Sequence, residues 1–284
     1  MNDIRQFKTE DIRRCGEIMY LAFKTIADQH NFPPDFPNAD VTSNVLGMLN
    51  DAPVFDGFVA EEEGSILGSI FVSRRSSVGG ISVITVDPEL QNRSVGRQLM
   101  QAGISHLADQ GHSRLQLIQA GYHSRSLCLY AKLGFIATDL LSTMVGDPIN
   151  KVIPGRVVRP AKQEDADACN ALCTQVHGFD RAGEVYGAIE QGMASVVESG
   201  EGISGYTTGV SFIGHGVGRS NEDLKALIVS AKELTGPGVM VPTTNGELFS
   251  WCLENGLRVN QQFTLMDTAP SGRPNGVYWP GILC

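Results

Sequence analysis

A polar stretch between an apolar strand and an apolar helix combines residue types that could bind an anion. Residues 81–86 alternate as in a strand and stop at Asp87-Pro88, while Val95, Leu99 and Leu107 recur at helical spacing. The first turn of a helix leaves backbone N–H groups unpaired and carries a partial positive charge, which favours phosphate. The stretch contributes amide, cationic and glycine residues: Asn92, Arg93, Gly96 and Arg97. It therefore predicts a phosphate-binding loop.

A second stretch, residues 124–135, reads as a short helix that Gly134 ends before Phe135 opens a new strand. It carries one tyrosine, Tyr130, which could do chemistry or only pack as one more aromatic side chain on a helix. The elements that must position both stretches are two neighbouring strands, expected at residues 81–86 and 113–119, and the helices that follow them. The strand–loop–helix order repeats, as in an α/β unit.

Together the two stretches resemble the GNAT acyl-CoA N-acyltransferases. Gln91-x-x-Ser94-x-Gly96 is similar to that family's pyrophosphate loop, Gln/Arg-x-x-Gly-x-Gly/Ala, with serine in place of the first glycine. The second stretch is similar to the family's Asn-x-x-Ala-x-x-Leu-Tyr-x-Lys-Leu-Gly-Phe segment. Its matching residues are Leu129, Tyr130, Lys132, Leu133, Gly134 and Phe135, while His123 replaces the asparagine and Ser126 the alanine.

The resemblance implies acyl transfer from acetyl-CoA, as co-substrate, to an amine. The pantetheine arm would lie between the strands near Ile84–Val86 and Leu115–Leu117, and an amide near Val86 could stabilise an oxyanion. The residues implied in cofactor binding are Ile84, Thr85, Val86, Gln91, Asn92, Arg93, Ser94, Val95, Gly96, Arg97, His123 and Ser126. Tyr130 would be the general acid, because a phenol with a pKa of about 10 can protonate a departing thiolate.

The general base is left open between several groups. The strand at residues 81–86 offers only Ser82 and Thr85 as polar residues. Asp28, His30 and Glu61 are candidates by region alone. Some multidomain GNAT-like enzymes bring the chain terminus into the site, which makes the carboxylate of Cys284 another candidate. The apolar run before Cys284 is compatible with a buried terminus.

Composition limits the kinds of partner. The chain has 284 residues and a net charge of −9, which disfavours nucleic acid and suits a cationic amine of a small molecule or peptide. No apolar run approaches the roughly 20 residues of a membrane helix and no leader is recognisable, so we expect a cytoplasmic protein. Cys169 and Cys173 lack a second ligand pair, so no metal is expected. Many GNAT-like proteins pair as homodimers, which the sequence leaves open.

The second part of the chain repeats the first. Residues 4–11 align with residues 158–165, and Asn255-Gly256-Leu257 imitates Leu133-Gly134-Phe135. The resemblance and the repeat predict an α/β (α+β) protein of two tandem GNAT-like folds, each a mixed central sheet flanked by helices. The expected boundaries are residues 1–146 for a catalytic domain, 147–155 for a linker and 156–284 for a degenerate domain.

The repeat predicts that the second half has lost the chemistry. Its presumed loop, residues 216–223, ends in Glu222 and Asp223, which would repel a phosphate, and Cys252 stands at the position of Tyr130. The leading hypothesis is an acetyl-CoA-dependent N-acetyltransferase. The alternative is a non-catalytic tandem protein that binds acyl-CoA or another ligand. The sequence does not identify the acceptor or the acyl-chain preference.

Overall fold

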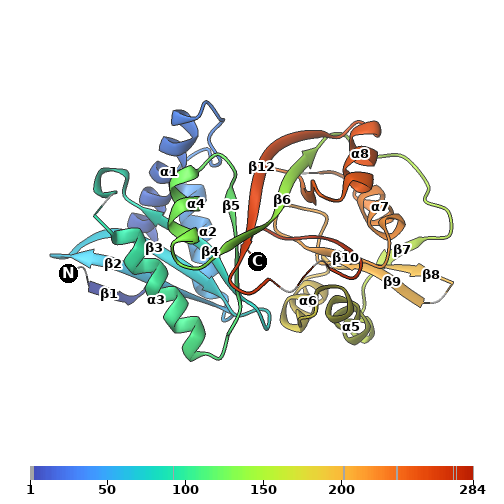
Figure 1. The fold of residues 1–284 in the computed structure, drawn as a ribbon, viewed down its shortest axis with the longest axis horizontal. Coiled ribbons are helices and arrows are strands. Elements are labelled where there is room, and N and C mark those ends of the chain that lie inside the picture. The colour runs from blue at the N-terminus through green and yellow to red at the C-terminus, as the bar shows by residue number, and fades with distance from the viewer. Residues whose placement is uncertain are drawn as a thin grey trace.

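The computed structural model describes residues 3–91, 93–200, 202–234, 236–270, 272 and 274–283. The two halves of the chain lie side by side, with the N-terminus at the outer edge of the first half and the C-terminus in the middle of the molecule (Figure 1). Within the described ranges, no helix is both long enough and apolar enough to cross a bilayer.

The first half alternates strands and helices along the chain. Its strands are β1 (Asp3–Gln6), β2 (Phe55–Glu62), β3 (Ser65–Ser73), β4 (Gly79–Val86), β5 (Leu115–Ala120) and β6 (Ile136–Val145). Its helices are α1 (Ile12–Gln29), α2 (Ala39–Asp51), α3 (Val95–Asp109) and α4 (Ser124–Ala131), with 3-10 turns η1 (Thr9–Asp11) and η2 (Pro88–Leu90).

The second half repeats this order, mostly with shorter elements, and adds the strand β13. Its strands are β7 (Val157–Pro160), β8 (Ser195–Ser199), β9 (Gly202–Thr207), β10 (Gly216–Gly218), β11 (Val239–Pro242), β12 (Arg258–Asp267) and β13 (Val277–Trp279). Its helices are α5 (Ala166–His177), α6 (Ala182–Glu190), α7 (Asn221–Ser230) and α8 (Gly246–Glu254), with the 3-10 turn η3 (Gln163–Asp165).

The side-chain contacts of the two halves confirm the predicted repeat. Arg5 pairs with Asp11 and with Glu61, both at 2.8 Å. Arg159 makes the same two contacts in the second half, with Asp165 at 2.6 Å and Glu198 at 2.9 Å. In each half the arginine therefore ties the first strand to the turn before the first helix and to the neighbouring strand.

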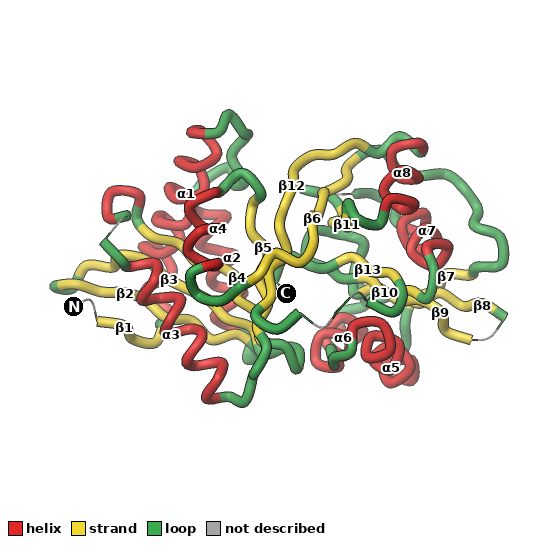
Figure 2. The backbone as a smooth tube through the Cα atoms, in the orientation of Figure 1, coloured by secondary structure: helices red, strands yellow, loops and turns green. Residues whose placement is uncertain are grey.

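The halves are interlocked by exchanged strands. The described strands form one sheet in the order β1-β2-β3-β4-β5-β12-β6-β11 and another in the order β13-β10-β9-β8-β7. β12 lies between β5 and β6 of the first half (Figure 1), and β6 in turn pairs with β11 (Figure 2). The sequence analysis does not predict this exchange, because the pattern of an amphipathic strand does not specify which neighbour it pairs with. The predicted domain boundaries stay a prediction.

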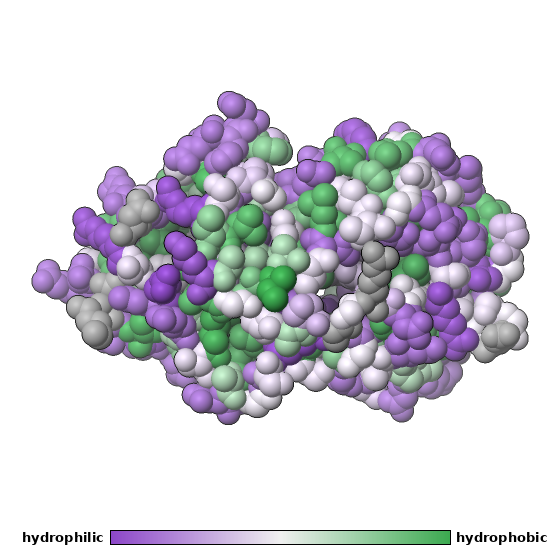
Figure 3. All heavy atoms as spheres, in the orientation of Figure 1, coloured by the Kyte–Doolittle hydropathy of each residue, from purple (hydrophilic) through white to green (hydrophobic). Residues whose placement is uncertain are grey.

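Helices cover both faces of each sheet (Figure 2). In the first half, α3 and α4 share an apolar cluster with β4 and β5, whereas α1 and α2 pack on the opposite face around Cys15, Met19 and Leu46. In the second half, α7 and α8 lie on one face and α5 and α6 on the other. On the face drawn in Figure 3, hydrophilic residues cover the outer ends and apolar residues gather near the middle, over α4 and β6.

Candidate functional site

An opening separates the ends of β4 and β5. The two parallel strands pair only from Gly79–Leu115 to Ile81–Leu117 and then diverge. The opening is therefore bordered by residues 82–86 and 118–120, and not by Leu115–Leu117, which the sequence analysis had placed there. Asp87 donates its N–H to Leu67 of β3 at 2.9 Å, and alternate residues of a strand direct their amides to opposite edges. The amide of Val86 consequently faces the opening.

A β-bulge at Ser82 marks the point of divergence. The β3–β4 register shifts between Phe71–Val83 and Val72–Ile81, which leaves Ser82 unpaired. The Ser82 hydroxyl donates to the backbone oxygen of Leu283 at 3.1 Å. Cys284, which the sequence analysis proposed as a base, lies outside the described residues, but the residue before it is thus held beside β4.

The predicted phosphate loop joins β4 to the start of α3. Asp87 caps η2 by accepting from the N–H of Glu89 at 3.1 Å. Ser94 occupies the N-cap of α3 in a left-handed conformation, with φ 65° and ψ 6°, and its side chain makes no capping bond. A Cβ on Gly96 would lie 3.6 Å from both Val86 and Leu129. The loop glycine, the end of β4 and helix α4 therefore meet at one place.

The charges around this helix start favour an anion. The first turn of α3 has no acidic residue. Arg93 and Arg97 are exposed there, and neither forms an ion pair with any described residue. Gln91 accepts a hydrogen bond from Arg125, which ties the loop to α4. Asn92, the remaining polar residue of the predicted loop, lies outside the described residues.

Helix α4 contributes Tyr130 and the residues at its start. His123 is the N-cap and accepts from the N–H of Ser126 at 3.2 Å, which explains how histidine can replace the family's asparagine. Burial lowers the pKa of His123, which favours the neutral ring needed for this role. Tyr130 is buried in one apolar cluster with Ile84 and Val86, and burial raises the pKa of Tyr130 to about 12.

These residues fit the two ends of an acyl-CoA. The helix start offers N–H groups and two arginines for phosphates, and the chain leaves room above Gly96, where a Cβ would make only ordinary contacts. Farther in, the buried hydroxyl oxygen of Thr85 on β4 has no hydrogen-bond partner in the described chain. Ile84, Thr85 and Val86 all belong to the end of β4 that diverges from β5.

In the second half, protein side chains occupy the corresponding helix start, at the beginning of α7. β10 leads almost directly into α7, so the residues expected to form a loop, Gly216–Gly218, are a strand instead. Asp223 accepts from the N–H of Ser220 at 2.9 Å and from the guanidinium of Arg156 at 2.6 Å. A buried carboxylate inside the first turn therefore takes the place that a phosphate would need.

The strand opening of the second half is also filled. β13 pairs with β10 along Gly216–Trp279 to Gly218–Val277 and contacts β11 as well. Trp279 is fully buried among α7, α8 and β11 side chains. A Cβ on Gly216 would lie 2.5 Å from the Trp279 ring, so this glycine is required by the close approach. The chain's own end thus occupies the space between β10 and β11.

The remaining base candidates are dispersed. Glu61 is bound to Arg5 at the outer part of the sheet. Asp28 pairs with Lys24 on the exposed surface of α1. His30 is exposed, and its Nδ1 lies 2.9 Å from the oxygen of Ile26. None of these contacts brings a candidate to Tyr130, whereas the chain end is brought to β4.

Sequence reasoning missed an aromatic group beside α4. Phe32, from the loop after α1, stacks on Tyr122 at 4.4 Å between ring centroids, and His30 lies 5.3 Å from the same ring. Asp35 is exposed at the surface, yet crowding by neighbouring atoms removes water from its carboxyl and raises its pKa to about 6. No spacing signal links residues 30–36 to Tyr122, because a long loop brings them together. Among the described residues, no cluster of three His, Cys, Asp or Glu side chains could hold a metal.

Comparisons with known proteins agree with this geometry. Residues 23–135 match the acetyltransferase (GNAT) family. A mycothiol acetyltransferase of Cellulomonas flavigena is 31% identical over 122 residues, which is 38% of this chain and 35% of that protein. One of Amycolatopsis mediterranei is 34% identical over 90 residues, 28% of this chain and 30% of that protein. The chain thus spans about a third of the length of these relatives.

Solved structures resemble the whole chain. A candidate acetyltransferase from Pyrococcus horikoshii has a TM-score of 0.73 at 14% identity, covering 99% of this chain and 95% of that one. A tandem GNAT protein from the clavulanic acid biosynthesis pathway has a TM-score of 0.57 at 12% identity, covering 96% and 100%. At these identities the likeness concerns the fold. The sequence match thus concerns residues 23–135, which match the GNAT family, and the whole chain has the fold of tandem GNAT proteins.

Proposed function

We propose that the first half is an acyl-CoA-dependent N-acetyltransferase that acts on an amine of a small molecule or peptide. The observation that carries this proposal is the meeting of Gly96, Val86 and α4 at the opening between β4 and β5. It is supported by the GNAT match over residues 23–135 and by relatives named as acetyltransferases. Because β13 and Asp223 occupy the matching places in the second half, we assign one acyl-CoA site to each chain.

Acyl-CoA would supply an acyl group activated as a thioester. The α3 start, with Arg93 and Arg97, would hold the phosphates, and the free edge of β4 would align the arm. The Val86 amide would donate to the carbonyl oxygen as negative charge develops on it. Tyr130, still a neutral phenol at physiological pH, would give its proton to the sulfur as the C–S bond breaks and the new C–N bond forms.

We propose the C-terminal carboxylate of Cys284 as the group that takes the proton from the attacking amine. The support is the bond from Ser82 to the oxygen of Leu283, which fixes the penultimate residue at the bulge of β4. The neighbouring residue Ile282 donates its N–H to the backbone oxygen of Phe212, in the second half, at 2.9 Å. The last described residues are therefore held by both halves. A terminal carboxylate is ionised at neutral pH and can accept a proton.

A Tyr130→Phe variant tests the role of the phenol. We expect acetyl-CoA to bind as tightly as to the wild type, with one molecule per chain by calorimetry, because the change removes one buried oxygen and no phosphate contact. Turnover of a screened amine, followed by release of free CoA thiol, should fall by about 10²–10⁴-fold, as for loss of a general acid.

The same experiment separates the alternative, a non-catalytic acyl-CoA-binding protein. The left-handed serine in the loop is the observation that favours this alternative. Wild-type protein that binds acetyl-CoA and acetylates no amine of a broad panel would support it. A variant with unchanged turnover would show instead that Tyr130 only packs.

A further inference from the structure

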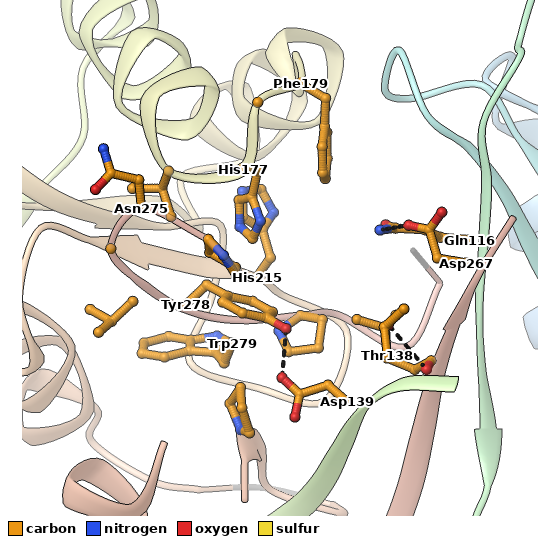
Figure 4. Close-up of a pocket in the computed structure, with 18 of the residues that line it drawn as sticks. Gln116, Thr138, Asp139, His177, Phe179, His215, Asp267, Asn275, Tyr278 and Trp279 are labelled. Atoms are coloured by element: carbon orange, nitrogen blue, oxygen red, sulfur yellow. Dashed lines mark hydrogen bonds between the residues drawn. The ribbon is translucent and has the colours of Figure 1, made fainter. Parts of the chain in front are cut away.

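A cavity of about 730 Å³ lies between the two halves, away from the opening at β4. Its walls come from β5, β6 and β12 on one side and from β13 and the segment after α5 on the other (Figure 4). Neither Tyr130 nor Gly96 is among the lining residues. Volumes of this size are typical of small-molecule sites. The cavity is therefore a candidate site distinct from the acyl-transfer centre.

The two lining arginines are already neutralised. Arg114 pairs with buried Asp267 at 2.8 Å, and Gln116 also donates to this carboxylate, at 2.7 Å. Arg181 pairs with buried Glu184 at 2.9 Å. Neither arginine is thus free to hold an anionic ligand, and an anion would have to compete with a buried carboxylate for it.

Asp139 of β6 is a lining carboxylate that has no ion-pair partner among the described residues. One of its oxygens accepts from the Tyr278 hydroxyl at 2.8 Å (Figure 4). The other accepts from the Thr244 hydroxyl at 2.6 Å. No lysine, arginine or histidine of the described ranges lies within ion-pair distance of it. Two hydroxyl donors orient a carboxylate without cancelling its charge, so the cavity keeps one negative charge available to a ligand.

Aromatic side chains form the wall next to Asp139. The rings of His177 and Tyr278 meet edge to face at 4.7 Å, and Phe179 lies 5.1 Å from His177. Burial lowers the pKa of His177 well below its usual value, so this ring is neutral and adds no repulsion to a cation. The wall next to Asp139 therefore offers apolar ring faces to a ligand.

We propose that this cavity binds a small organic ammonium ion, with the cationic group on Asp139 and the apolar part among His177, Phe179 and Tyr278. An ammonium group pairs with a carboxylate through charge-assisted hydrogen bonds, and an apolar group gains by packing against the rings beside it. The ligand would not be acetylated there, because β13 fills the strand opening of this half and forms part of the cavity wall. The second half would then be a ligand-binding module.

The test is calorimetric titration of the full chain, without acyl-CoA, with two probes of similar size and opposite charge. Tyramine carries an ammonium group and 4-hydroxyphenylacetate a carboxylate on the same phenol ring. We expect one tyramine per chain and at least about tenfold weaker binding of the acid. Asp139→Asn should weaken tyramine binding by about tenfold or more, as for loss of a charge-assisted hydrogen bond.

Two further variants keep the proposal falsifiable. Asp147→Asn makes the same change of charge at an exposed residue just after β6 and should bind tyramine like the wild type. Thr138→Trp places a bulky ring at the cavity wall and should abolish binding even if Asp139→Asn unfolds. The proposal is overturned if wild-type protein ignores tyramine at millimolar concentration, if the acid binds equally well, or if Thr138→Trp leaves binding intact.

Discussion

Ser94 occupies a backbone conformation that favours glycine. Its φ of 65° places it in the left-handed region, which disfavours residues that carry a Cβ by about 1–2 kcal/mol. The GNAT loop pattern has glycine at this position, so the departure seen in the sequence corresponds to local backbone strain. The structure keeps the turn despite the serine, because Val95 and Leu99 anchor the following helix in the core.

Ser94→Gly should therefore stabilise the protein. Relief of about 1–2 kcal/mol of strain outweighs the roughly 0.5–1 kcal/mol that a flexible glycine costs in entropy, so the free energy of unfolding should rise by up to ~1 kcal/mol. Ser105→Gly, in the exposed middle of α3, is the matched control and should lower it by about 0.3–0.5 kcal/mol, the difference in helix propensity between serine and glycine. Denaturant titration measures both, and equal losses would contradict the assignment of strain to Ser94.

At the residue scale, the sequence predicted what local spacing can encode. The glycine-containing loop and Tyr130 lie within short motifs, and the structure brings the loop glycine, β4 and α4 together as those motifs imply. Ser82 and Tyr122 were not predicted to matter, because their contacts come from residues about 200 and 90 positions away. Contacts between residues so far apart in the chain leave no periodic pattern in a single sequence.

At the element scale, β13 is the clearest difference between the halves. The sequence indicated a buried apolar end, but not that it would insert between β10 and β11. A three-residue strand has too little pattern to reveal its partners. The same uncertainty applied to β10, because Gly216–Gly218 resembled part of a phosphate loop in the sequence. These residues form a strand instead, and its glycines allow Trp279 and Asp223 to approach closely.

Gly216→Ala tests how tightly β13 is packed. The added methyl group would meet the indole ring at 2.5 Å, and overpacking of this kind costs about 1–3 kcal/mol of unfolding free energy. Gly187→Ala in α6, where no atom lies within 4 Å of the new Cβ, should instead stabilise by up to about 1 kcal/mol. Thermal unfolding compares the two, and a neutral Gly216→Ala would show that β13 is loosely held.

At the scale of the whole molecule, the chain end connects the halves. β13 belongs to the second sheet, and a few residues later Leu283 accepts a hydrogen bond from Ser82 in the first. Family resemblance and the internal repeat predicted the tandem fold. They could not predict the exchange of β12 and β6, since a repeat specifies elements and not the neighbours of each strand.

Replacing the carboxylate of Cys284 with a carboxamide, by chemical ligation of the last residues, tests the proposed base at this scale. Turnover should fall by about 10²-fold or more, because an amide cannot take the amine proton, while acetyl-CoA affinity stays unchanged. A short N-terminal extension is the control, since that end lies at the outer edge of the molecule (Figure 1). Full activity of the carboxamide would show that Cys284 is not the base.

The exchanged strand also bears on biosynthesis. β5 and β6 leave the ribosome well before the strand that bridges them, Arg258–Asp267, which follows β7 to β11 and α5 to α8 in the second half of the chain. Until then two strand edges in the first half have no partner, and unpaired edges invite aggregation. We therefore expect the first half to need protection by chaperones until Arg258–Asp267 has been made, and the first sheet to be completed only then.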